Sequence, residues 1–182
     1  MPIPLPEEDG ISPFRSDLLA GRTALITGGT RGIGLATAKA ILAAGGNVVI
    51  TGRSIDSVNS SVKELGHCAA SAPGERVGGI ALEMKNIESF HDKWNEANAL
   101  PCCGRRGVDI LVNNAGSLNF ARFGSTRAQD FDEVMETNLR GAYFLSQCVA
   151  EDWISRGDDC GTRNIQADVP IIMFMDPADF HL

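Results

Sequence analysis

The chain has 182 residues, 43% of them hydrophobic and 21% charged, which suits one globular domain with its own core. Its formal net charge of −7 argues against general binding to nucleic acids or membrane surfaces, because such partners need clustered lysine and arginine. The five cysteines form no C-x-x-C pair and have no histidine at zinc-ligand spacing. The sequence therefore predicts no metal site and no disulfide framework, and it favours a reducing compartment.

The first twenty residues are rich in proline and acidic side chains, and they have neither the basic flank nor the apolar segment of a signal peptide. We interpret residues 1–20 as a flexible arm. No stretch of the sequence approaches the roughly twenty apolar residues that a membrane-spanning helix needs. We therefore expect a cytoplasmic protein without a membrane partner.

A glycine-rich turn organises the rest of the chain. It follows the apolar run Ala24-Leu25-Ile26 and precedes a helical pattern over 35–44, so the sequence predicts strand, turn and helix. Glycines allow a sharp turn and a close approach of the backbone to a ligand, and the amide groups at a helix N-terminus attract phosphate. A turn that serves packing alone is the alternative. The residues predicted to bind a nucleotide here are Gly28, Thr30, Arg31, Gly32, Ile33 and Gly34.

The next strand predicts which nucleotide is bound. Residues 47–51 form a β-branched run, which completes a strand-helix-strand unit, and Gly52-Arg53-Ser54 follows it. An acidic side chain at this point would bind a ribose 2′-hydroxyl, whereas a cation accommodates a 2′-phosphate. The segment contains Arg53 and no acid, and Arg31 can approach the same phosphate. We assign Arg53 and Ser54 to the cofactor site; two solvated arginines are the alternative.

Further alternation of helices and strands predicts a doubly wound α/β sheet. Ser54 is a candidate helix cap, 77–82 and 108–112 are the expected third and fourth strands, and an amphipathic helix over 87–97 lies between them. The fourth strand ends abruptly in Asn113-Asn114-Ala115-Gly116. Ligands of such sheets lie outside the carboxyl ends of the strands, so this tetrapeptide is expected on the path of the cofactor.

The two motifs together, Thr27-Gly-x-x-x-Gly-x-Gly34 and Asn113-Asn-Ala-Gly116, resemble the short-chain dehydrogenase/reductase family over about residues 20–157. The resemblance implies a Rossmann-type parallel sheet in three layers and a nicotinamide cofactor. It also implies that Asn113, Ala115 and Gly116 lie along the adenosine and ribose. The arginines match members that prefer NADP(H).

A long helix is predicted from about Thr126 to Ser155, with a broad apolar stripe on one side. Asn138 lies within this stripe and needs hydrogen-bond partners there, so it is either a structural tie or part of a site. By resemblance, Asn138 is the catalytic asparagine that holds a proton-relay water. Relatives commonly pair through this helix, so we expect homo-oligomers or pairing through 126–155.

The resemblance ends after about residue 157. Family members have a serine and a Tyr-x-x-x-Lys pair there, in which the lysine lowers the pKa of the proton-donating tyrosine. The only tyrosine here is Tyr143, and no lysine follows Lys93. One apolar run, Val169 to Met175, is a possible fifth strand. The chain therefore looks truncated or divergent, with a sheet that is incomplete at its C-terminal half.

We expect three parts: the arm 1–20, an NADP-binding Rossmann domain over 21–157 and a divergent tail over 158–182. The leading hypothesis is an NAD(P)(H)-dependent oxidoreductase that transfers hydride to or from a small-molecule carbonyl or secondary alcohol. The absent Tyr-Lys pair keeps open a non-catalytic protein that binds nucleotide or pairs with a complete relative. A different Rossmann enzyme, such as a methyltransferase, is disfavoured because an acidic residue would be expected near Arg53.

Overall fold

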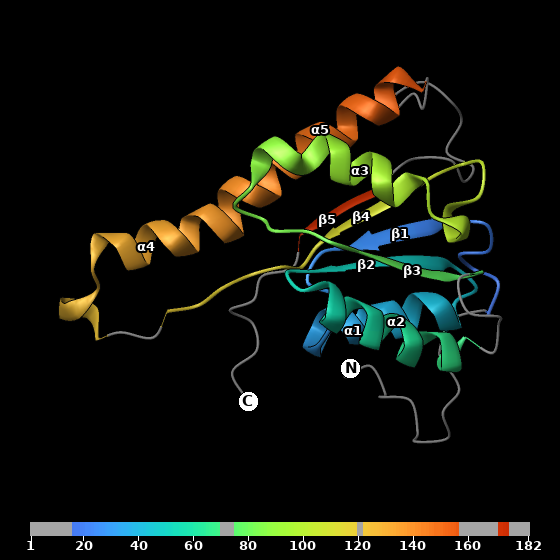
Figure 1. Ribbon diagram of the computed structural model, residues 1–182, viewed down its shortest axis with the longest axis horizontal. Coiled ribbons are helices and arrows are strands. Elements are labelled where there is room, and N and C mark those ends of the chain that lie inside the picture. The colour runs from blue at the N-terminus through green and yellow to red at the C-terminus, as the bar shows by residue number, and fades with distance from the viewer. Residues whose placement is uncertain (1–15, 70–74, 120–121, 157–170, 175–182) are drawn as a thin grey trace, which may run out of the picture.

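The computed structural model describes residues 16–69, 75–119, 122–156 and 171–174. These residues form a five-stranded parallel sheet in the order β3-β2-β1-β4-β5, with helices on both faces (Figure 1). The predicted Rossmann-type doubly wound sheet with three layers is therefore confirmed. The strands are β1 (Thr23–Ile26), β2 (Asn47–Gly52), β3 (Val77–Ala81), β4 (Ile110–Asn113) and β5 (Ile171–Phe174).

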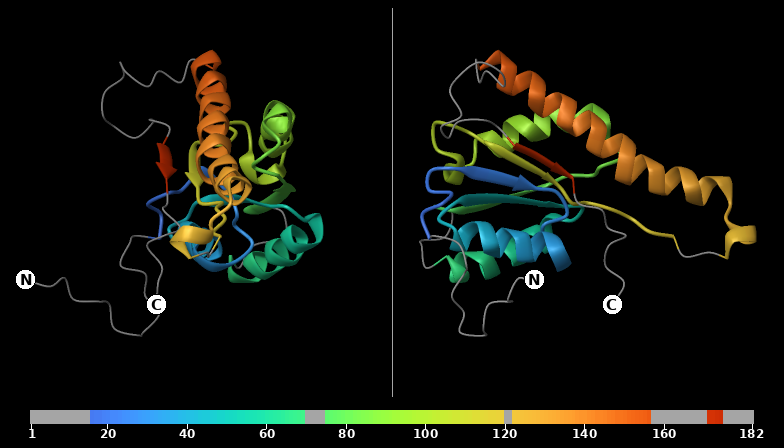
Figure 2. Two further views of the ribbon diagram at one scale, coloured as in Figure 1. Left: turned by 90° about the vertical axis from the view of Figure 1, so that its left-hand side faces the viewer. Right: turned by 180° about the vertical axis from the view of Figure 1, so that it is seen from behind.

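Two layers of helices cover the sheet. The helices α1 (Gly32–Ala43) and α2 (Ile55–Cys68) lie on one face, and α3 (Phe90–Asn98) and α5 (Ala142–Ser155) lie on the other. The helix α4 (Ala128–Met135) extends beyond the end of the sheet (Figure 2). Short 3-10 helices are η1 (Ile87–Ser89), η2 (Pro101–Cys103) and η3 (Phe123–Ser125), and a π-helix, η4 (Glu136–Gly141), joins α4 to α5.

The strands contribute to two separate cores because successive side chains of a strand point to opposite faces of the sheet. Alternate residues such as Leu25 and Leu111 pack with α3 and α5. Their neighbours Ile26 and Val112 pack with α1 and α2. The central strands are buried on both faces, which explains their almost continuous runs of apolar residues.

Two tryptophans join α3 to α5. The rings of Trp94 and Trp153 pack edge to face with their centroids 6.3 Å apart. Nε1 of Trp94 donates a hydrogen bond to the carboxylate of Asp152 at 2.7 Å, and Nε1 of Trp153 donates to the carbonyl of Val108 at 2.9 Å. Both indole rings are buried with their polar atoms satisfied, so this layer is fixed to the segment that enters β4.

The predicted helix from about Thr126 to Ser155 is present from Ala128 to Ser155, and its centre is a π-helix, which the sequence pattern did not indicate. The π-helix ends at Gly141, where an added Cβ would lie 2.4 Å from the carbonyl oxygen of Met84. Only glycine permits this close approach between the helix and the segment after β3. A hydrophobic period of 3.6 residues cannot reveal a turn whose shape depends on such a tertiary contact.

The predicted apolar stripe divides into two parts at this π-helix. Leu145, Val149 and Trp153 are buried against the sheet. Phe131 and Leu139 are 57% and 58% exposed, respectively. The stripe is therefore core along α5 and surface along α4 and η4.

The fifth strand lies within the predicted run Val169 to Met175, whose outermost residues are outside the described part of the chain. It pairs parallel to β4, with Ile171 opposite Ile110. Residues 1–15 and 157–170 are also outside the described part, so the boundaries of the arm and the tail stay predictions. Among the described residues, no helix has the length and apolar character needed to cross a membrane.

Candidate functional site

The strand order places a topological switch point between β1 and β4, and we use the word crevice for the space outside the carboxyl ends of these two strands. From β1 the chain moves outward through β2 to β3, and it then returns to the other side of β1 for β4. The connections that leave the carboxyl ends of β1 and β4 therefore run in opposite directions and separate. Such a switch point is where open α/β sheets bind ligands, and both predicted motifs begin there.

Three glycines of the turn after β1 have different surroundings. An added Cβ at Gly28, whose φ is +64°, would meet the Cα of Ala115 at 3.0 Å. At Gly34 it would lie 2.6 Å from the carbonyl oxygen of Gly28, so the first turn of α1 packs directly on the loop. Gly32, with a φ of +53°, has open space where its Cβ would be. Gly28 thus lets the turn approach the backbone of Ala115, and Gly34 lets α1 pack on the turn. Gly32 leaves room for a ligand.

Thr27 ties the two motifs to each other. Its Oγ1 accepts hydrogen bonds from the backbone amides of Asn114 and Ala115, both at 2.9 Å, and donates to the carbonyl of Val112 at 3.3 Å. The side-chain amide of Asn114 donates in return to the carbonyls of Thr27 and Gly28 at 2.8 and 3.2 Å. These bonds fix the distance between the two walls of the crevice.

Replacing Thr27 by valine keeps the shape of the side chain but leaves two part-buried amides without an acceptor. We expect urea unfolding to show a loss of about 2–4 kcal/mol, since an unsatisfied buried donor costs about 1–3 kcal/mol. Thr51→Val is the matched control, because the hydroxyl of Thr51 has no hydrogen bond to any described residue. Equal losses in the two variants would show that the tie contributes nothing specific.

The predicted phosphate-binding side chains surround the mouth of this crevice. Arg31 occupies the N-cap position of α1, and Arg53 and Ser54 follow β2; all three are exposed. Neither arginine forms an ion pair or hydrogen bond with another side chain in the described ranges. The expected capping bond of Ser54 is absent; instead the Ser57 hydroxyl donates to the Ser54 carbonyl at 2.8 Å.

Thr30 and Ile33 are half-buried within the turn. The carbonyl of Thr30 accepts a hydrogen bond from the Ser61 hydroxyl at 3.0 Å, which joins the turn to α2. An added Cβ at Gly52 would meet the methyl group of Thr30 at 2.8 Å. These contacts place the glycine turn against the carboxyl end of β2, beside Arg53.

The residues of the second motif, 113–116, lie partly in the core and partly on the surface. Asn113 is the last residue of β4, one residue beyond the predicted end of that strand, and its amide donates to the Ser146 hydroxyl at 3.0 Å under α5. Its Oδ1 is buried without a partner among the described residues. Ala115 is half-buried and Gly116 is exposed at the crevice. Of the three predicted residues, Asn113 therefore turns its side chain away from the ligand space, as strand alternation requires.

Asn138 forms a two-point tie to the loop after the second motif. Its Oδ1 accepts from the amide of Ser117 at 2.7 Å, and its Nδ2 donates to the carbonyl of the same residue at 2.9 Å. The structure thus supports the structural-tie interpretation for the side chain. The sequence analysis included Thr27 and Asn114 in the two motifs without predicting that they bond to each other's loops, and it missed Ser117. The doubled asparagine was a signal that one amide faces inward and the other faces the turn.

Two features of this region would suit a phosphorylated ligand. Open space at Gly32 adjoins the N-terminus of α1, whose amides and dipole favour a pyrophosphate. The two cations Arg31 and Arg53 have no internal acid to neutralise them in the described part of the chain. A phosphorylated nucleotide would therefore meet both shape and charge in this crevice.

Known proteins share this arrangement. The family model described as short chain dehydrogenase matches residues 22–160. The 3-oxoacyl-[acyl-carrier-protein] reductase of Aquifex aeolicus is 34% identical over 71% of this chain and 49% of its own. The L-xylulose reductase of Mesocricetus auratus is 35% identical over 82% of this chain and 54% of its own.

A solved structure agrees with these sequences. The citronellol catabolism dehydrogenase of Pseudomonas aeruginosa superimposes with a TM-score of 0.66 at 28% identity, over 78% of this chain and 54% of that one. The chain spans about half the length of the relatives it matches. From its fold, its two motifs and these matches, the chain belongs to the short-chain dehydrogenase family.

Proposed function

We propose that this chain is the cofactor-binding part of an oxidoreductase that transfers a hydride between NADP(H) and a carbonyl or secondary alcohol. The open space at Gly32, together with Arg31 and Arg53, which have no side-chain partner among the described residues, is the observation that supports this most directly. The names of the relatives, a 3-oxoacyl reductase and an L-xylulose reductase, support a small-molecule carbonyl as substrate. Family membership by itself implies NAD(P)(H) in general.

The residues of the chain would hold the cofactor at two points. The amides at the start of α1 and Gly32 would bind the pyrophosphate, and Arg31 and Arg53 would bind the 2′-phosphate. Thr30, Ile33 and Ser54 line the same mouth, while Ala115 and Gly116 face the adenosine. The bound nicotinamide supplies the hydride, and the residues of the chain bind and orient the nicotinamide cofactor.

Asn138 has a positioning role in this proposal. Its amide holds the Ser117 backbone, and through it the loop that leaves β4 beside the nicotinamide end of the crevice. The catalytic role implied by the family resemblance stays a prediction. A nucleotide-binding protein without catalysis is the second candidate, because the only tyrosine, Tyr143, is 62% exposed on α5.

We also propose that the chain pairs through the helices of 126–155. Exposed apolar side chains gather along this segment, and large exposed apolar surfaces commonly mark interfaces. The contributing residues are Phe131, Met135, Leu139, Tyr143, Phe144 and Ile154. A cytoplasmic location and the absence of nucleic-acid partners stay predictions from composition.

The proposed cofactor site is tested by Gly32→Ala, with NADPH affinity measured by calorimetry. A methyl group there occupies the space for the pyrophosphate, so we expect the dissociation constant to rise at least about tenfold. Gly104→Ala is the matched control: Gly104 has a φ of +55° against +53° for Gly32, and both have open space at the Cβ. Both variants place alanine at a positive φ that L-residues rarely adopt, so both should be less stable than the parent chain.

The comparison separates binding from stability. Both variants should unfold at reduced urea concentrations, and only Gly32→Ala should lose NADPH affinity. If NADPH binds equally to both variants and to the parent chain, the open space at Gly32 is not the nucleotide site.

A further inference from the structure

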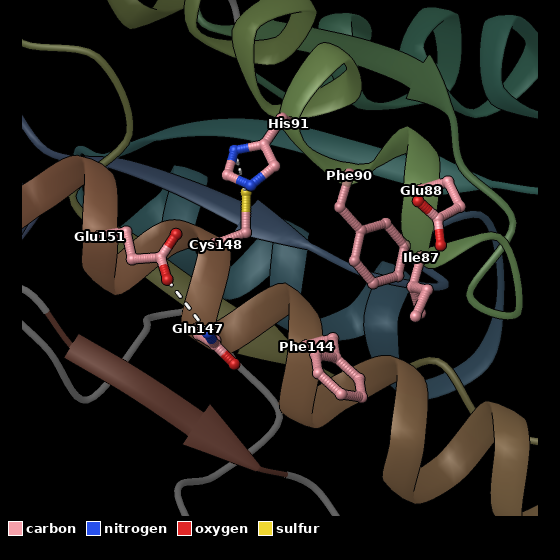
Figure 3. A pocket seen from close by; sticks show the side chains of 8 residues that line it. All are labelled: Ile87, Glu88, Phe90, His91, Phe144, Gln147, Cys148 and Glu151. Atoms are coloured by element: carbon pink, nitrogen blue, oxygen red, sulfur yellow. Dashed lines mark hydrogen bonds between the residues drawn. The ribbon is translucent and has the colours of Figure 1, made fainter.

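The α3–α5 layer has a hollow toward each end of α3. The first, of about 210 Å³, lies between η1, the start of α3 and the middle of α5 (Figure 3). Polar groups of this hollow bond to one another: Sγ of Cys148 lies 3.4 Å from Nδ1 of His91, and Gln147 donates to the carboxylate of Glu151 at 3.0 Å. It also lies on the helical segment already proposed for pairing, so it suggests no separate site.

The second hollow, of about 220 Å³, lies between the last turns of α3 and α5 and the loop 104–107. This loop precedes β4, so the hollow is at the amino ends of the parallel strands, whereas the glycine turn follows the carboxyl end of β1. The cofactor site therefore does not use it. Three arginines, two asparagines and one acid line the hollow: Arg105, Arg106, Arg156, Asn95, Asn98 and Asp152.

The loop that forms one wall of this second hollow is held in a fixed shape. Gly107 has a φ of +78°, and an added Cβ there would lie 2.5 Å from Oδ1 of Asn98 and 2.8 Å from Nη1 of Arg156. Oδ1 of Asn98 accepts a hydrogen bond from the amide of Val108 at 2.9 Å, and Nη1 of Arg156 donates to the carbonyl of Arg106 at 2.7 Å. The loop is thus bonded to the ends of both helices, and a ligand would find the walls already in place.

Arginines outnumber acids around this loop, in a chain whose formal net charge is −7. Asp152 pairs with Arg156 at 3.1 Å, and Asp109, just after the loop, pairs with Arg106. Arg105 forms no ion pair or hydrogen bond with any described residue. Each of the two acids is therefore already paired with an arginine, and Arg105 adds a positive charge that no acid in the described ranges balances.

Arg105 and Asn95 supply donors to the hollow that the described residues do not use. Both side chains are exposed, and neither has a hydrogen-bond partner in the described part of the chain. A guanidinium presents a fork of N–H groups that fits the oxygens of a phosphate, and the asparagine amide adds two more donors. We propose that this hollow binds a phosphate group, as inorganic phosphate or as the phosphomonoester of a small molecule, through Arg105 and Asn95.

Charge and size both favour such a ligand. A phosphomonoester has a charge of about −1.5 to −2 at pH 7, so it gains more than a carboxylate from the arginines of the loop. Pockets for drug-sized ligands have volumes of about 300–1,000 Å³, and this hollow of about 220 Å³ is smaller. A phosphate with a short organic group therefore fits the hollow better than a whole dinucleotide does.

The test is calorimetric titration of the full chain with inorganic phosphate, with glycerol phosphate and with acetate. We expect both phosphate probes to bind more tightly than acetate, and tighter binding of glycerol phosphate would identify a phosphomonoester as the ligand. Arg105→Gln should weaken phosphate binding at least about tenfold, because a charge-assisted bond is lost. Asn95→Asp should act in the same direction, because a carboxylate repels the anion. Lys63→Gln, which removes the same charge from an exposed position on α2, is the control and should bind phosphate normally.

The cofactor site is also suited to phosphate, so a second measurement separates the two sites. Nε1 of Trp94 donates to the carboxylate of Asp152 at 2.7 Å, and Asp152 lines the hollow beside Arg156. Phosphate in the hollow should therefore change tryptophan fluorescence with the same dissociation constant as in calorimetry. Phosphate binding that is lost in Arg53→Gln and retained in Arg105→Gln would belong to the cofactor site and overturn the proposal. Acetate binding as tight as phosphate binding, or no saturable binding of either phosphate probe, would also overturn it.

Discussion

A protein made of these 182 residues is expected to bind NADPH yet reduce ketones and quinones more slowly than about 1 s⁻¹, the low end of ordinary enzyme turnover. Hydride transfer to a carbonyl leaves an alkoxide that needs a proton. A positioned acid supplies about 10²–10⁴ in rate, and hydrogen bonds to the carbonyl oxygen contribute further. The chain lacks the Tyr-x-x-x-Lys pair that supplies this proton in the family that its sequence resembles.

Tyr143 is the obvious substitute for the missing proton donor, but its position is unsuitable. Its ring is 62% exposed and packs edge to face on Phe144, with centroids 5.3 Å apart. It follows Asn138 by five residues, so in a regular helix the two side chains would diverge by roughly 140°. Gln147 stands four residues on, where a lysine would be needed to lower the pKa of the phenol.

The measurement is NADPH consumption against a panel of carbonyl compounds, with Tyr143→Phe and Asn138→Ala run beside the parent chain. All three should be equally inactive. Turnover above about 1 s⁻¹ that disappears in Tyr143→Phe would show that this tyrosine donates the proton, and the prediction would be wrong.

The second large effect is a reversal of cofactor preference in Arg53→Asp. The parent chain should bind NADPH more tightly than NADH, because Arg53 and Arg31 would both bond the 2′-phosphate. Each charge-assisted bond is worth about 1.5–3 kcal/mol, which is tenfold or more in the dissociation constant. The aspartate removes one such bond, repels the phosphate and offers an acceptor to the 2′-hydroxyl of NADH.

Calorimetric titration with both cofactors measures the two affinities. Arg105→Asp is the control, because Arg105 is also exposed and its replacement changes the net charge by the same amount, in the loop that precedes β4. That variant should retain the NADPH preference. Equal affinities for the two cofactors in the parent chain would count decisively against a role for the arginines.

Local pattern predicted the sheet well. The runs around Leu25, Val49 and Leu111 contain mostly apolar and β-branched residues, and the glycines between them permit few alternatives to strand-turn-helix. The order of the strands follows from right-handed crossovers and from the switch point implied by the two motifs. The pattern did not reveal the π-helix within 126–155, where the shape of the turn depends on a contact between Gly141 and Met84.

The site was predicted less completely than the fold. Positions that need glycine for steric reasons are visible in a sequence, and Gly28, Gly32 and Gly34 lie where we expected. The direction of a polar side chain is not visible, because it depends on which residue ends the strand. A shift of one residue at the end of β4 turned Asn113 inward and left Asn114 to bind the turn after β1.

Both tryptophans of the chain lie in the α3–α5 layer, so tryptophan fluorescence reports on the unfolding of this layer alone. Intrinsic fluorescence would follow the separation of α3 from α5, while the α1–α2 layer, which has no indole, would unfold silently. Circular dichroism averages over both layers. Coincident transitions from the two methods would mean that the helical layers on opposite faces of the sheet unfold as one cooperative unit.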